Sequence, residues 1–132
     1  MEGSVMMRAL VITHGDIGEE FVKVAELILG PLEGLEAASN AGHSAEALIE
    51  LINNWLDREE GPALIMIDDY GGSCATAAQL ACGERKDRFI LGGVNLAMVL
   101  GFLTWRENSE AEVLVQRIVD KGREAIVRLG GS

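Results

Sequence analysis

The sequence is poor in aromatic residues and in basic side chains, and each shortage narrows what the protein can be. Aromatic residues make up 5% of the 132 residues, so the core must be built mainly from Leu, Ile, Val and Ala. Lys and Arg number 11 against 21 Asp and Glu, which gives a formal net charge of -10 at pH 7. Because nucleic acids and anionic membranes attract cationic surfaces, this balance argues against both as partners. It fits a soluble protein, or one that docks a basic partner.

Cysteine is also scarce, and no uncharged apolar run is long enough to indicate a membrane-spanning helix. Cys74 and Cys82 match no zinc-binding spacing, so we expect reduced, partly buried thiols, no bound metal and no cofactor. The uncharged run 89–105 is short for a spanning helix and contains several glycines, which favours a strand followed by a helix. With no secretory signal expected, the cytoplasm is the predicted location.

Apolar runs alternate with helical patterns from end to end. Predicted strands cover Ala9–Thr13, Leu35–Ala38, Ala63–Ile67 and Phe89–Leu91, and predicted helices begin near Ile17, Ser44, Ser73, Leu96 and Ser109. Repeated strand–helix units predict an α/β fold, a doubly wound, mostly parallel four-stranded sheet with helices on both faces. We expect one domain, 1–132, with an ordered core of about 8–129; Gly3, Ser4 and 130–132 should be frayed.

Two helix starts carry the pattern of a capping box, in which a polar side chain and an acid three residues later satisfy backbone amides. Asp16 is followed by Glu19, and Ser109 is followed by Glu112. The sequence therefore predicts side-chain caps from Asp16 and from Ser109.

His14 is the most informative residue, because it directly follows the first predicted strand and precedes Gly15 and a helix. Open α/β sheets bind ligands at the carboxyl ends of their strands. A neutral imidazole has one ring nitrogen with a usable lone pair, so His14 could accept a phosphoryl group, act as a base or bind a metal. His43, the only other histidine, is predicted to be a solvated loop residue.

Asp68 is the natural partner of His14, since it follows the third predicted strand. If the first and third strands are neighbours, their ends lie about 4.8 Å apart. A carboxylate there can accept the proton of one imidazole nitrogen, which fixes the tautomer and leaves the other nitrogen more nucleophilic. An aspartate that merely caps a loop remains the alternative.

Gly71, Gly72 and Ser73 open the third predicted helix. Unobstructed backbone N–H groups at a helix start can bind a phosphoryl group, helped by the helix dipole, and Ser73 adds a hydroxyl donor. A simple turn with a serine cap is the other interpretation. Together these residues suggest a nucleophilic histidine that handles an anion.

At these positions the chain resembles the mannose-type IIA component of the bacterial phosphoenolpyruvate-dependent sugar phosphotransferase system, over about 8–129. No single motif is decisive, but their order and spacing together are specific. The matching segments are Thr13-His14-Gly15, 25–30 (AELILG), 45–48 (AEAL), Asp68-x-Tyr70-Gly71-Gly72-Ser73, Gly93-Val94-Asn95 and Gly122-Arg123-Glu124.

The resemblance implies a phosphotransferase. His14 takes the place of the histidine that receives phosphate from the histidine-containing phosphocarrier protein and passes it to a separate IIB component. Asp68 takes the place of the acid that hydrogen-bonds this histidine, and Ser73 that of a phosphate-side hydroxyl. The family is dimeric and exchanges a C-terminal strand, for which 125–129 (AIVRL) is the candidate. The resemblance does not give the sugar.

Two residues depart from the family's pattern. Cys74 and Ala97 stand where prolines are common, which bears on loop rigidity and partner fit.

Other interpretations of the sequence are open. A receiver domain phosphorylated on Asp68 is disfavoured because the first strand ends in Thr13-His14 instead of an acidic pair. The phosphotransfer subunit of dihydroxyacetone kinase shares the fold and the histidine, but the Gly-Gly-Ser loop favours the sugar system. The third alternative is a non-catalytic binding or regulatory protein that has kept only the fold; intact His14 and Asp68 argue against it, which leaves a phosphorylated regulator without a transport role.

Overall fold

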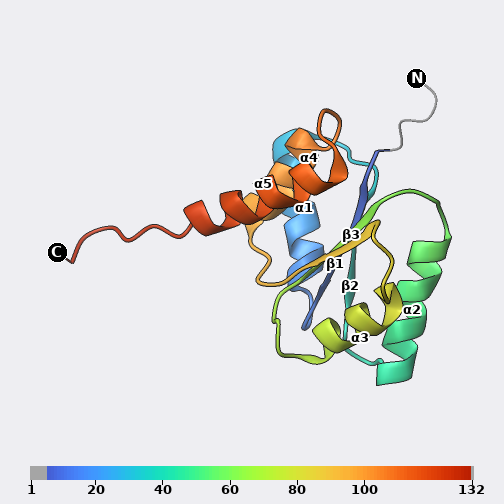
Figure 1. The fold of residues 1–132 in the computed structure, drawn as a ribbon. Helices are drawn as coiled ribbons and strands as arrows, with labels where there is room; N and C mark the ends of the chain where they lie inside the picture. Colours follow the sequence, from blue (N-terminus) through green and yellow to red (C-terminus); the bar gives the residue numbers. More distant parts are fainter. Residues whose placement is uncertain (1–5, 132) are drawn as a thin grey trace.

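The computed structural model describes residues 6–131 and alternates strands with helices, as the sequence predicts (Figure 1). Gly3, Ser4 and Ser132, for which we predicted fraying, lie outside the described residues. No helix in the described part of the chain is long and apolar enough to cross a membrane. The elements are β1 (Arg8–Thr13), α1 (Ile17–Leu29), β2 (Leu35–Ser39), α2 (Ala45–Asp57), β3 (Ala63–Ile67), α3 (Ser73–Cys82), β4 (Arg88–Leu91), α4 (Leu96–Trp105) and α5 (Ala111–Glu124).

The four strands form one parallel sheet in the order β2-β1-β3-β4. β1 therefore lies between β2 and β3, and its register aligns Ile12 with Ile67 of β3. The residues that follow these two strands, His14 and Asp68, leave the same edge of the sheet. The predicted adjacency of the first and third strands is confirmed.

Helices cover both faces of the sheet, with α2 and α3 on one side and α1, α4 and α5 on the other (Figure 1). Alternate residues of each strand serve the two layers: Leu10 and Ile12 pack toward α2 and α3, whereas Ala9 and Val11 pack toward the other helices. Because β1 and β3 are buried on both faces, they read as continuous apolar runs. The two layers hold the carboxyl ends of β1 and β3 rigidly in place.

The start of α1 is stabilised differently from the prediction. Asp16 is the N-cap, but its side chain makes no capping hydrogen bond. An N-cap side chain reaches the N–H groups of the first helical turn when its backbone is extended, and the backbone of Asp16 is not. Instead the buried Thr13 hydroxyl accepts a hydrogen bond of 2.8 Å from the Gly18 N–H. The hydroxyl at the end of β1 thus ties the strand to the helix across the His14 loop.

The second predicted capping box is also wrong, while two other polar residues do cap helices. Glu110, not Ser109, is the N-cap of α5, and its side chain makes no cap bond. Ser44 accepts a hydrogen bond from the Ala47 N–H at the start of α2. Asn95 does the same for α4 through the Met98 N–H.

The C-terminal segment after α5 forms no strand within this single chain. Residues 125–131 run out from the body of the protein (Figure 1). Ile126, Val127 and Leu129 are 81%, 66% and 90% exposed. Apolar side chains exposed in this way are unfavourable in an isolated chain. The strand predicted for 125–129 stays a prediction.

Replacing Thr13 with the isosteric valine should destabilise the protein by about 1–3 kcal/mol, since the buried Gly18 N–H would lose its acceptor. Urea unfolding followed by circular dichroism measures the change. A Thr13→Val variant with an unchanged unfolding midpoint would show that the hydroxyl does not anchor α1.

Candidate functional site

The candidate site lies at the carboxyl edge of the sheet, where β1 and β3 end and α3 begins. His14 directly follows β1, and Asp68 directly follows β3. Gly15 turns the chain toward α1 with φ of 62°, a conformation that side-chain-bearing residues rarely adopt. The structure brings all five residues that we singled out to one edge: His14 follows β1, and Asp68, Gly71, Gly72 and Ser73 lie between the end of β3 and the first residue of α3.

His14 and Asp68 contact each other through both the backbone and the ring of the histidine. The His14 backbone N–H donates to Asp68 Oδ2 at 3.0 Å. The ring Nδ1 lies 3.3 Å from Asp68 Oδ1 and 3.2 Å from Oδ2. The His14 side chain is 46% exposed, whereas that of Asp68 is 18% exposed. One carboxylate thus fixes the position of an imidazole that solvent or a partner can reach.

The charge state of Asp68 determines which ring nitrogen is free. Burial opposes ionisation of this carboxyl, but the hydrogen bonds from the His14 backbone and ring outweigh it and lower the pKa of Asp68. An ionised carboxylate can only accept hydrogen bonds, so Nδ1 of His14 carries the hydrogen. The lone pair of the neutral ring is then on Nε2, which faces away from Asp68.

Gly72 is the N-cap of α3 and lies against the free edge of the His14 ring. A Cβ atom at Gly72 would lie 3.2 Å from Cε1 and 3.5 Å from Nε2 of His14. A side chain here would therefore press on the ring at Cε1, next to its free nitrogen. The absence of a Cβ lets the first turn of α3 approach the position where Nε2 would carry an added group.

The start of α3 can receive an anion. Gly72 has no side chain to cap the first-turn amides, and the positive end of the helix dipole lies here. Ser73 is exposed at the first position of the helix. Asp69 is exposed, and its carboxylate accepts a hydrogen bond from the Gly71 N–H. That bond holds the glycine loop in shape.

Cys74 is a neighbour of His14 that the sequence did not reveal. Ligand atoms of His14, Asp68 and Cys74 all lie within 4.8 Å of one another. Cys74 is fully buried, and burial, together with the charges of Asp68 and Asp69, raises the pKa of its thiol. The spacing of the two cysteines does not indicate this contact, because the strand order and the position of α3 bring Cys74 beside His14. His43 is exposed in the loop after β2, as predicted.

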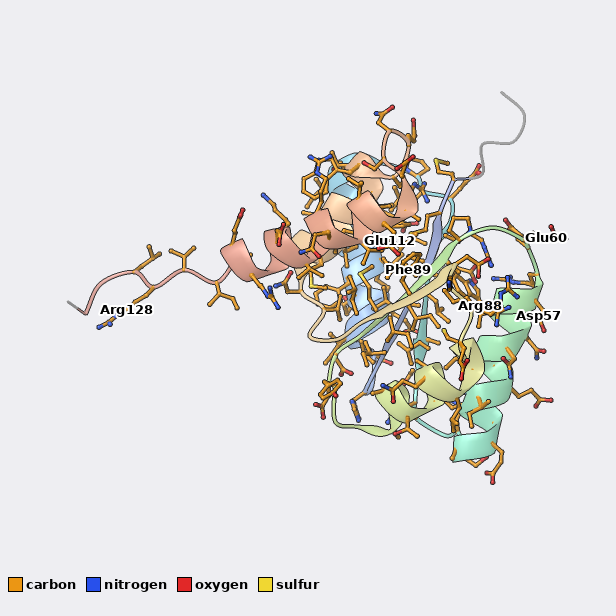
Figure 2. All side chains as sticks on the ribbon, in the orientation of Figure 1. Asp57, Glu60, Arg88, Phe89, Glu112 and Arg128 are labelled. Atoms are coloured by element: carbon orange, nitrogen blue, oxygen red, sulfur yellow. The ribbon has the colours of Figure 1, made fainter. Side chains whose placement is uncertain are left out.

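A charged cavity of about 140 Å³ lies at the opposite edge of the sheet, where β3 and β4 begin. Figure 2 labels three of the residues that line it, Asp57, Glu60 and Arg88. Arg8 and Arg85 are further members, and Glu59 lies close to Arg8. Positive and negative side chains are balanced there, so the cavity has no clear preference for an anion. The edge with His14 is the better candidate site.

Comparison with known proteins identifies the family. A family model described as the fructose IIA component of the sugar phosphotransferase system matches residues 8–119. The chain belongs to this family of phosphotransferase-system IIA components, as the motifs around His14 and Asp68 indicated.

Individual relatives agree with this assignment. The chain is 34% identical over 130 residues to the mannose-specific EIIAB component of Escherichia coli K12, covering 94% of this chain and 40% of that protein. It therefore spans less than half the length of that relative. The fold is similar to the EIIA component of Streptococcus agalactiae (TM-score 0.86, 23% identity, 93% and 97% of the two chains). It is also similar to the mannose/sorbose IIA subunit of Enterococcus faecalis (TM-score 0.81, 20% identity, 97% and 98%).

The two glycines before α3 offer a matched test of the site's geometry. A Cβ at Gly72 would crowd His14, whereas a Cβ at Gly71 would meet nothing within 4 Å. Gly72→Ala should therefore shift the NMR signals of the His14 ring and slow its reaction with a phosphoryl donor by up to about tenfold, because small misplacements of a reacting atom are costly. Gly71→Ala should leave both unchanged. Equal effects of the two substitutions would contradict the proposed contact.

Proposed function

We propose that this protein is a phosphoryl-transfer relay of a sugar phosphotransferase system. His14 receives a phosphoryl group from the histidine-containing phosphocarrier protein and passes it to a IIB component. The observation that carries the proposal is the hydrogen bond between Nδ1 of His14 and Asp68, which leaves Nε2 as the nucleophile. Membership of the IIA family supports the same reading.

In the transfer, the Nε2 lone pair of His14 attacks the phosphorus atom carried by the donor. A new N–P bond forms as the N–P bond to the donor histidine breaks, and that histidine keeps the bonding electron pair. The imidazole of His14 becomes positively charged, and the ionised Asp68 stabilises this charge through Nδ1–H. The phosphoryl oxygens are received by the Ser73 amide and hydroxyl at the start of α3, whereas the Gly72 N–H donates to the Asp69 carbonyl. The same steps in reverse deliver the group to the IIB histidine.

The surface around the site suits docking of another protein. Ile17 and Tyr70, in the segments that follow β1 and β3, are 48% and 78% exposed although both are large and apolar. Exposed apolar side chains beside a reactive group fit a transient partner interface. The net charge of -10 favours a basic partner protein over nucleic acid or an anionic membrane. The proposed place of action is the cytoplasm, with no insertion into the membrane.

His14 should carry the phosphate, and His43 should not. The wild-type protein, His14→Ala and His43→Ala are incubated with phosphoenolpyruvate, enzyme I and the phosphocarrier protein, and the acid-labile phosphate is mapped by mass spectrometry. Label should appear on His14 in the wild type and in His43→Ala, and it should be lost in His14→Ala. Label on His43, or undiminished label without His14, would overturn the proposed function.

Asp68 should orient His14 instead of carrying phosphate. Asp68→Asn keeps the size of the side chain but removes its negative charge and presents either an amide N–H₂ or an oxygen to the ring, which disturbs the tautomer. Phosphoryl transfer should slow by about 10²-fold, in the range for a lost acid–base partner. Unchanged rates would remove Asp68 from the mechanism. An acid-stable, hydroxylamine-sensitive acyl phosphate in the wild type would instead favour phosphorylation of an aspartate.

We further propose that the protein is a homodimer in which each C-terminal segment adds a strand to the partner's sheet. The proposal is supported by the exposed apolar residues of 125–129 and by the edge strands β2 and β4, whose outer backbone groups are open to pairing. Exchange of an identical segment between subunits is a low-cost route to a dimer.

Truncation after Glu124 tests this exchange without shortening α5. Sedimentation of the full chain at micromolar concentration should give a dimer, and the truncated chain should give a monomer or aggregates. Ile126→Asp combined with Val127→Asp keeps the chain length and should have the same effect. A full-length chain that sediments as a stable monomer would show that the segment does not join subunits.

A further inference from the structure

Three side chains at the candidate site are of types that bind metal ions, and the proposed phosphoryl relay involves no metal binding by them. His14 offers a ring nitrogen, Asp68 a carboxylate oxygen and Cys74 a sulfur, and one ligand atom from each lies within 4.8 Å of the others. In a tetrahedral zinc site with bonds of about 2.0–2.3 Å, the ligand atoms are roughly 3.5 Å apart. Small side-chain rotations would therefore bring the three atoms to zinc-binding distances.

The chemical character of the ligands selects the ion. Sulfur and imidazole nitrogen favour Zn²⁺ and similar transition ions, whereas Mg²⁺ and Ca²⁺ prefer oxygen ligands. Cys74 is fully buried, but the His14 side chain is 46% exposed, so an ion can approach the cluster from the side of the imidazole. Asp68 is ionised at neutral pH and supplies a negative charge. Three protein ligands would leave one coordination position for water.

We propose that His14, Asp68 and Cys74 form a Zn²⁺-binding site whose occupancy competes with phosphoryl acceptance by His14. Binding forms a Zn–S bond as the Cys74 thiol releases its proton to solvent, which is the ordinary fate of a coordinating thiol. Zn²⁺ takes Nδ1 of His14 in place of its hydrogen bond to Asp68. The ring proton then moves to Nε2, which loses the lone pair of the proposed nucleophile, so this consequence rests on the proposed function.

Cobalt titration tests the site without any measurement of activity. Co²⁺ is added to metal-free wild-type protein, Cys74→Ala and Cys82→Ala, and absorbance is recorded. Cys82 is the matched control, because it is a second buried cysteine of the same helix. The wild type and Cys82→Ala should show a thiolate-to-cobalt charge-transfer band in the near ultraviolet that one equivalent of Zn²⁺ abolishes. Cys74→Ala should lack the band and bind at least about 10²-fold more weakly, since even outer-shell partners are worth ~10–100-fold.

Cys74→Ser serves if the alanine variant does not fold, because a serine retains the size and polarity but supplies no sulfur for the band. A wild type without the band, a band that survives either change at Cys74, or a band that is lost in Cys82→Ala would overturn the site.

Competition is measured with phosphorylated phosphocarrier protein purified away from enzyme I. Transfer to the wild type should proceed with a chelator and fall at least tenfold with one equivalent of Zn²⁺, whereas Cys74→Ala should accept phosphate equally in both conditions. Wild-type transfer that Zn²⁺ leaves unchanged, although cobalt binds, would overturn the competition while the proposed function stands. No transfer even with the chelator would overturn the proposed function, and the cobalt spectra would still decide the metal site.

Discussion

The hydrogen bond between the imidazole of His14 and the carboxylate of Asp68 is the interaction on which the proposed function depends. It holds Nδ1 as a donor, leaves Nε2 with the lone pair and keeps a negative charge beside a ring that would become positive in the proposed transfer. The bond exists because β1 and β3 are parallel neighbours whose register ends at the same edge. The approach of α3 through Gly72 places amide donors on the other side of the ring.

The rest of the structure keeps these two loops in place. Both strands are buried on both faces, so neither can shift without exposing apolar side chains. Thr13 links the end of β1 to the start of α1, and Asn95 links the start of α4 to the Gly122 carbonyl of α5. This anchoring keeps the exposed His14 oriented, as the proposed relay would require in order to present one nitrogen to two different proteins.

Much of this could be predicted from the sequence, because the signals are strong and local. The apolar runs of β1 and β3 and the glycines before α3 predict the strands, the sheet edge and the pairing of His14 with Asp68. The caps of α1 and α5 could not be predicted, because the residue types of a capping box do not determine the backbone conformation at the N-cap. At Asp16 that conformation is not extended. Cys74 was missed for a different reason: its proximity to His14 depends on strand order and on the close approach of α3, which spacing between cysteines does not encode.

The most direct test of the central claim is to determine which nitrogen of His14 carries the phosphoryl group. Long-range proton–nitrogen NMR of ¹⁵N-histidine-labelled protein, phosphorylated through its carrier, distinguishes the two ring positions. If Asp68 holds Nδ1, the phosphoryl group is on Nε2 and the Nδ1 proton remains, shifted by its hydrogen bond to the carboxylate. A phosphoryl group on Nδ1 would contradict the account, because that nitrogen would have to give up Asp68 before it could react.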